Sequence, residues 1–155
     1  MTDTIRDLDA LLDMAMDDIE DLPPVGVPPT GHYNLLVSAT RVTPDEAGKN
    51  PYIKFAYEVT AVNEVKNPDE ANLAAVGMTF TKNFSPVKRD GTVNDIGLKL
   101  LKKECAPYAV HFGTSSISST VEALKTVEVA AAIVRKQDKR DADRWDVYLN
   151  DVTIL

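Results

Sequence analysis

The sequence contains few of the residues from which catalytic and metal centres are built. It has one cysteine and two histidines in 155 residues. His32 and His111 lie far apart and lack a cysteine or acidic residue at metal-ligand spacing, so we interpret both as structural. The single cysteine, Cys105, excludes an intrachain disulfide and fits a reducing compartment. It falls on the apolar side of an expected helix, which indicates a buried, inert thiol.

Motifs for phosphate binding, zinc binding and redox chemistry are also missing. We find no glycine-rich phosphate loop, no HExxH and no CxxC, and the acidic residues near the N-terminus lack the spacing of a calcium loop. No apolar run approaches the ~20 residues of a membrane span, and the acidic N-terminus does not resemble a signal peptide. We therefore expect a non-enzymatic, cytoplasmic protein without cofactor, metal or membrane contact.

The charges, by contrast, are strongly divided along the chain. The first thirty residues hold eight acidic residues against one arginine, Arg6, a net charge of −7. The other 125 residues carry 16 basic and 16 acidic side chains, so their net charge is zero. The acidic pI near 4.8 therefore describes a short arm, and it does not exclude a polyanionic partner for the rest of the chain.

The arm itself has the pattern of an acidic amphipathic helix. Apolar residues recur at three- and four-residue steps over 4–22, and Thr4 with Asp7 resembles a capping box. The acids at the far end of this segment oppose the helix dipole, so its last turn is poorly stabilised. Paired prolines at 23–24 and 28–29 then indicate a stiff, extended linker over residues 23–30. The partner-binding candidates of the arm are Ile5, Leu8, Leu12, Asp17, Asp18, Ile19, Glu20 and Asp21.

The remaining residues, 31–155, predict one domain of short strands. Alternating apolar residues indicate strands at 32–42, 52–62, 77–84, 127–135 and 144–155. Asn94 or Asp95 caps a helix that runs to about Ala106 and ends at Pro107, and Ser119 with Glu122 opens one further helical turn. Five strands with a helix between the third and fourth predict an all-β fold, the five-stranded OB-fold barrel, with the helix closing one end. The predicted domains are thus 1–30 and 31–155.

A nucleic-acid interface is the best-supported kind of site. Barrels of this type hold single strands across their second and third strands, flanked by the loops after the first and fourth, and need cations and flat rings there. Residues 135–144 hold five cations in ten positions, although a solvated hairpin tip paired by its own aspartates explains this stretch equally well. Tyr52 beside Lys54 forms an exposed ring–cation pair, unless Tyr52 is packed under a loop.

Further aromatic residues and cations are candidates for the same nucleic-acid interface. Phe84 is alternatively a core residue, and of the two rings on the last strand we assign Trp145 to the core and Tyr148 to the surface. The nucleic-acid-binding candidates are Tyr52, Lys54, Lys82, Phe84, Lys88, Arg89, Arg135, Lys136, Lys139, Arg140, Arg144 and Tyr148.

The chain resembles bacteriophage single-stranded DNA-binding proteins with an OB-fold. The likeness rests on the acidic opening LDALLD…DDIEDLP and on a first strand of Gly-aromatic-hydrophobic pattern at 31–35. It implies sequence-independent binding of single-stranded DNA in phage replication or recombination, in the host cytoplasm. The family usually carries its acidic, partner-recruiting tail at the C-terminus, whereas here the acidic element is N-terminal. By analogy, the arm covers the basic groove when DNA is absent and docks replication or recombination proteins.

Two other functions remain open. The apolar stripe of the arm also suits a β-barrel adaptor that docks its helix in the groove of a partner. A phage structural component that assembles through the barrel edges is the third. The sequence does not decide whether the protein is a homo-oligomer.

Overall fold

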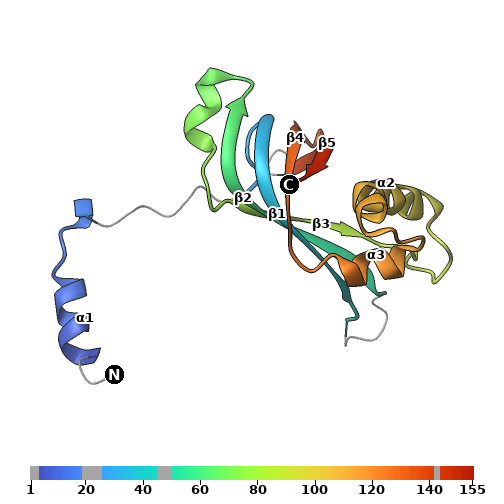
Figure 1. The fold of residues 1–155 in the computed structure, drawn as a ribbon, viewed down its shortest axis with the longest axis horizontal. Coiled ribbons are helices and arrows are strands. Elements are labelled where there is room, and N and C mark those ends of the chain that lie inside the picture. Colours follow the sequence, from blue (N-terminus) through green and yellow to red (C-terminus); the bar gives the residue numbers. More distant parts are fainter. Residues whose placement is uncertain (1–3, 19–25, 45–49, 142–143) are drawn as a thin grey trace.

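A computed structural model of the chain describes residues 4–18, 26–44, 50–141 and 144–155 (Figure 1). Its strands are β1 (Gly31–Val42), β2 (Tyr52–Val65), β3 (Thr79–Phe84), β4 (Val127–Gln137) and β5 (Trp145–Ile154). Its helices are α1 (Thr4–Leu12), α2 (Asp95–Phe112) and α3 (Ile117–Ala123), with short 3-10 turns η1 (Met16–Asp18) and η2 (Pro68–Leu73). The expected β-rich fold of five strands, with helix between the third and fourth, is confirmed.

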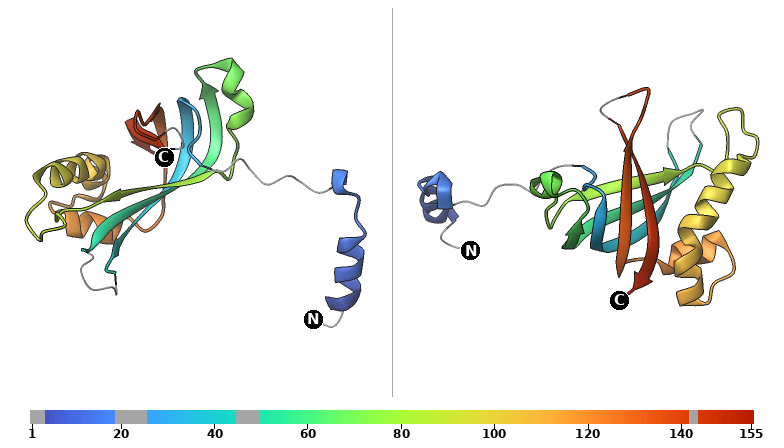
Figure 2. Two further views of the ribbon diagram at one scale, coloured as in Figure 1. Left: turned by 180° about the vertical axis from the view of Figure 1, so that it is seen from behind. Right: turned by 90° about the horizontal axis from the view of Figure 1, so that it is seen from above.

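The strands form one antiparallel sheet in the order β3-β2-β1-β4-β5. The first three strands run as a meander, and the chain then passes through α2 and α3 to reach the other side of β1. The sheet is strongly curled into a half-barrel, with α2 and α3 at one side (Figures 1 and 2). This order leaves β3 and β5 as the two edges of the sheet.

Alternation along each strand builds the core on the inner side of the curl. Tyr33, Leu35 and Val37 of β1 are fully buried, as are Phe55, Tyr57 and Val59 of β2 and Val129 and Ile133 of β4. Helix α2 adds Leu101 and Tyr108 to the same cluster. Burying one such side chain stabilises the fold by about 1.5–3 kcal/mol, which is why the period-two pattern located these strands well.

The curl of β1 comes with two breaks in its pairing with β2. The register shifts between His32 and Tyr33 and again between Asn34 and Leu35. Beside the first break, a Cβ on Gly31 would lie 2.1 Å from the Glu64 carbonyl oxygen. Only glycine allows this approach, and such bulges increase the local twist of a strand.

Helix α2 is longer than the sequence predicts. Asn94 is the N-cap, and its side chain accepts from the Gly97 amide at 3.0 Å. The expected end at Ala106 is wrong, because the helix continues through Pro107 to Phe112. The turn after Pro107 includes the buried Tyr108, so packing outweighs the hydrogen bond that proline removes.

The boundaries of the other helices also need correction. Helix α3 is capped by Ser116, which forms a capping box with Ser119, so the expected pair of Ser119 and Glu122 is wrong. Helix α1 ends at Leu12 rather than at residue 22, and its last turn has no basic residue to balance the helix dipole. Ile19, Glu20, Asp21 and residues 45–49 lie outside the described residues.

The segment before β1 packs against the sheet. Pro28 and Pro29 are buried, and the Tyr33 hydroxyl donates to the Pro29 carbonyl at 2.5 Å. Burial raises the pKa of Tyr33 to about 12, although the charge of Arg135 acts in the opposite direction. The end of the expected linker is therefore part of the packed body.

Candidate nucleic-acid interface

A cleft of about 490 Å³ separates the two edge strands of the sheet. In a closed barrel the edge strands would pair with each other, whereas here α2 lies beside the gap. We call this site the β3–β5 cleft. It is lined by residues 81–84 of β3, by Leu100, Lys103 and Glu104 of α2, and by residues 144–149 at the start of β5.

The start of β5 supplies two exposed aromatic rings to this cleft. The exposed fraction is 38% for Trp145 and 45% for Tyr148. The assignment of Trp145 to the core is therefore wrong, whereas Tyr148 is at the surface as predicted. Trp145 does alternate with the buried Val147, but it lies at the beginning of an edge strand, which has a neighbouring strand, β4, on one side only.

Each of these two rings lies next to a cation from β4. The Arg135 guanidinium is 4.3 Å from the Trp145 ring centroid, and the Lys136 ammonium is 5.9 Å from that of Tyr148. The register pairs Arg135 with Val147 and Lys136 with Asp146, so each ring is the diagonal neighbour of its cation. A cation beside an exposed ring favours stacking of a flat base together with contact to its phosphate.

Arg135 also holds the surrounding segments together. Its Nη2 lies 2.5 Å from Oε2 of Glu70, and its Nη1 donates to the Val27 carbonyl at 3.0 Å. Its backbone amide donates to the Thr30 hydroxyl at 3.1 Å. Because its side chain is largely buried in these contacts, Arg135 positions Trp145 and balances the charge of Glu70.

Lys82 forms part of the floor of the cleft. Strand alternation places it on the inner side with Phe80 and Phe84, and its Nζ lies 3.0 Å from Oε2 of Glu104. The Tyr57 hydroxyl donates to the other oxygen of Glu104. Burial, and then the charge of Glu104, raises the pKa of Tyr57 well above its ordinary value. The charge of Lys82 is thus already balanced within the protein.

Phe84 is a core residue at the edge of this floor. Its exposed fraction is 9%, and it packs edge-on against Phe55 with a centroid distance of 5.6 Å. Cys105, which follows Glu104 on α2, is buried as expected, and burial raises its pKa to about 11. Neither side chain offers a free surface to a ligand.

The remaining cations of this region are exposed on the β4–β5 hairpin. Lys136, Lys139, Arg140 and Arg144 all reach solvent. The backbone of the hairpin is fixed by Asp138, whose amide donates to the Arg144 carbonyl at 2.9 Å and whose carboxylate accepts from the Arg140 amide at 2.8 Å. Of the expected connection 136–143, residues 136 and 137 belong to β4.

The other four candidates gather at a different place. Tyr52 is half-buried at the start of β2 and lines a separate apolar cavity of about 340 Å³, with Leu98 and Leu101 of α2. Lys54 is half-buried nearby, and Lys88 and Arg89 are exposed in the β3–α2 connection. Asn50 precedes β2, and its side chain donates to the Lys88 carbonyl at 2.6 Å. This hydrogen bond joins the start of β2 to the β3–α2 connection. The predicted residues therefore form two separate groups instead of one continuous interface.

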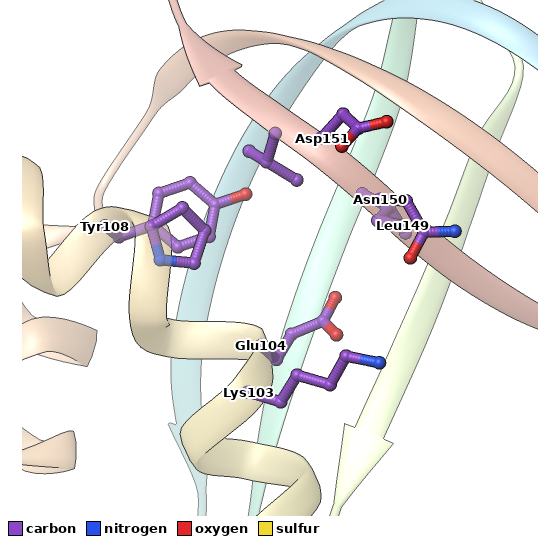
Figure 3. Close-up of a pocket in the computed structure, with 8 residues that line it drawn as sticks. Lys103, Glu104, Tyr108, Leu149, Asn150 and Asp151 are labelled. Atoms are coloured by element: carbon purple, nitrogen blue, oxygen red, sulfur yellow. The ribbon is translucent and has the colours of Figure 1, made fainter.

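No sequence pattern indicates Lys103 as a site residue. A third cavity has a volume of about 250 Å³. Figure 3 shows Lys103 and Glu104 of α2 on one side of it and Leu149 and Asn150 of β5 on the other. Lys103 is exposed and lines both this cavity and the β3–β5 cleft. Its position depends on how α2 packs against β5, which no local pattern specifies.

The arm candidates are described only in part. In α1, Leu8, Leu11 and Leu12 are exposed, and Asp17 and Asp18 lie in η1. The side chain of Ile5 is outside the described residues. Within the described ranges, no group of three or more histidine, cysteine, aspartate or glutamate side chains is placed to hold a metal ion. Of the helices in these ranges, none is long and apolar enough to cross a membrane.

Comparison of the chain with protein-family models, with curated proteins and with solved structures finds no match.

Proposed function

We propose that this protein is a non-enzymatic, sequence-independent single-stranded DNA-binding protein of the OB type. The observation that supports this most is the pair of exposed rings on β5, each with a cation from β4 beside it, at the open edge of the half-barrel. The strand order, with helix between β3 and β4, is compatible with an OB-like barrel. Phage replication or recombination, in the host cytoplasm, is the setting that the sequence resemblance favours.

In this proposal the two rings and the hairpin cations have separate tasks. Bases stack on Trp145 and Tyr148, at about 1–3 kcal/mol for each base. Exposed hairpin cations such as Lys139 and Arg140 neutralise phosphates and release their counterions. Neither task reads the edge of a base, so binding is independent of sequence. Lys82 and Arg135 support the site through their internal ion pairs.

The decisive experiment is fluorescence anisotropy of a labelled single-stranded oligonucleotide at low salt. We expect Trp145→Ala to weaken binding by about 5- to 150-fold, which corresponds to the loss of one stacked base. Trp145 is the single tryptophan, so quenching of its fluorescence by unlabelled oligonucleotide in the unaltered protein provides a second readout.

Leu73→Ala is the matched control, because it removes an exposed apolar side chain from η2, outside the cleft. It should leave the affinity unchanged. Tyr52→Ala reports whether the second group of candidates also contacts the strand. Absence of binding by the unaltered protein at low salt would reject the proposed function.

That negative result would favour the adaptor function instead. The observation behind it is the exposed row of leucines on α1, since an amphipathic helix with free apolar residues is a typical ligand for the groove of a partner. A large assembly formed without nucleic acid would favour a structural role.

A further inference from the structure

Helix α2 presents an exposed apolar stripe to solvent. Its apolar members are the exposed Ile96, Leu100 and Val110 and the half-buried Pro107, which follow one another, with Lys103 between them, at three- and four-residue steps and therefore share one face of the helix. Leu100 and Lys103 lie where this face meets the β3–β5 cleft. The exposed fraction is 71% for Ile96 and 85% for Val110. Large apolar side chains that remain exposed together on one element are a mark of interaction surfaces.

The charges around this stripe are mostly positive. Lys99, Lys102 and Lys103 are all exposed on α2. Of the two acidic residues of the helix, Asp95 is exposed, whereas Glu104 is bound to Lys82 and Tyr57 beneath it. The outer face of α2 thus combines apolar residues with lysines, which suits an acidic amphipathic partner.

The N-terminal helix of the same protein has the complementary character. In α1, Leu8 and Leu12 lie one turn apart, and the exposed fraction of Leu12 is 73%. The segment 8–18 holds four aspartates and no cation. A row of leucines flanked by carboxylates matches a row of apolar side chains flanked by lysines in both shape and charge.

Both surfaces remain exposed within one chain, so neither covers the other there. We propose that α1 of one copy docks on the outer face of α2 of a second copy. Such a contact joins two different surfaces, so it repeats head-to-tail and forms an open chain, or a closed ring where the rotation between copies closes. On a single strand these chains would place neighbouring copies side by side, which is the requirement for cooperative binding.

The test is sedimentation of the full-length protein without nucleic acid, over a wide range of concentrations at low and high salt. We expect the average mass to rise with concentration at low salt and to fall when salt screens the lysine–aspartate attraction. A donor variant, Leu8→Asp with Leu12→Asp, and an acceptor variant, Ile96→Asp with Val110→Asp, should each remain monomeric. None of the four side chains is buried or lines the β3–β5 cleft.

Mixing the two variants provides the sharpest check. The donor variant keeps its α2 face and the acceptor variant keeps its α1, so an equimolar mixture should form a one-to-one dimer and stop there. Circular dichroism of each variant controls for folding. A monomeric unaltered protein at low salt, or an acceptor variant that associates as the unaltered protein does, would overturn the proposal. Because no nucleic acid is present, this outcome is independent of the test of DNA binding.

Discussion

Glu104 is the residue on which the floor of the β3–β5 cleft depends. It accepts from Lys82 and from the Tyr57 hydroxyl, and the side chains of Glu104 and Lys82 are only 12% and 17% exposed. A largely buried ion pair is a weak source of net stability, but the removal of one partner leaves the other charge uncompensated. Glu104 is therefore more important for keeping Lys82 in place than for the energy of the pair itself.

We expect Glu104→Gln to lower the free energy of unfolding by about 3 kcal/mol, because the Lys82 ammonium loses its counter-charge. Chemical denaturation followed by Trp145 fluorescence measures this loss. Glu64→Gln is the matched control. Its carboxylate is 4.0 Å from His32, both side chains are mostly exposed, and the change should be below about 0.5 kcal/mol.

Replacing both Glu104 and Lys82 separates the net stability of the ion pair from the cost of leaving the Lys82 charge uncompensated. Glu104→Leu with Lys82→Met removes the whole pair and should be less destabilising than Glu104→Gln alone. An equal or larger loss in the double variant would mean that the pair itself stabilises the fold.

At the scale of elements, α2 is unusual in keeping a proline beyond its middle. Pro107 cannot donate to the Lys103 carbonyl four residues earlier, yet the helix reaches Phe112 and ends at Gly113, which has a φ of 67°. Glycine adopts this left-handed conformation without strain. Tyr108 and Leu101 pack against the sheet on both sides of the interruption, so tertiary contacts stabilise a helix that propensity would end earlier.

Pro107→Ala should therefore raise the free energy of unfolding by about 1–2 kcal/mol. It restores one hydrogen bond, and the gain is reduced because alanine gives the unfolded chain more freedom. Denaturation curves measure the change. The neighbouring Ala106→Pro, at an exposed position of the same helix, should lose about 3 kcal/mol. A loss of stability with Pro107→Ala would show that the proline ring itself packs favourably against β5.

At the scale of the whole molecule, the divided charge determines how binding responds to salt. The body is neutral overall, and Lys82 and Arg135 already have carboxylate partners. The exposed cations that line or border the cleft, Lys103 of α2 and those of the β4–β5 hairpin, are then the groups that attract a phosphate backbone there. The affinity should be modest for a single site and should fall as salt rises.

Replacement of Lys136, Lys139, Arg140 and Arg144 by alanine should flatten this dependence. Each cation that contacts a phosphate contributes a slope of about −0.7 in a plot of log affinity against log salt. The control replaces Arg41, Lys66 and Lys125 by alanine; these residues are exposed outside the cleft. For each variant, the change in slope is divided by the number of charges removed, and the two values are compared. An equal effect of both sets would mean that the hairpin has no special role.

Local patterns in the sequence determined most of the secondary structure. The alternation over residues 32–42 and 52–62 located β1 and β2, because each second side chain lies against a core that excludes water. The charge division and the helix between the third and fourth strands also follow from the sequence alone. The strand order and the curl required the structure.

Only the tertiary structure decided which side chains are free to bind. Lys82 and Glu104 are 22 positions apart, and Arg135 and Glu70 are 65 apart, so no local period indicates their pairing. The exposure of Trp145 likewise depends on β5 being an edge strand. A period-two pattern states which face a residue takes, whereas the curl of the sheet and the position of α2 determine whether that face is covered.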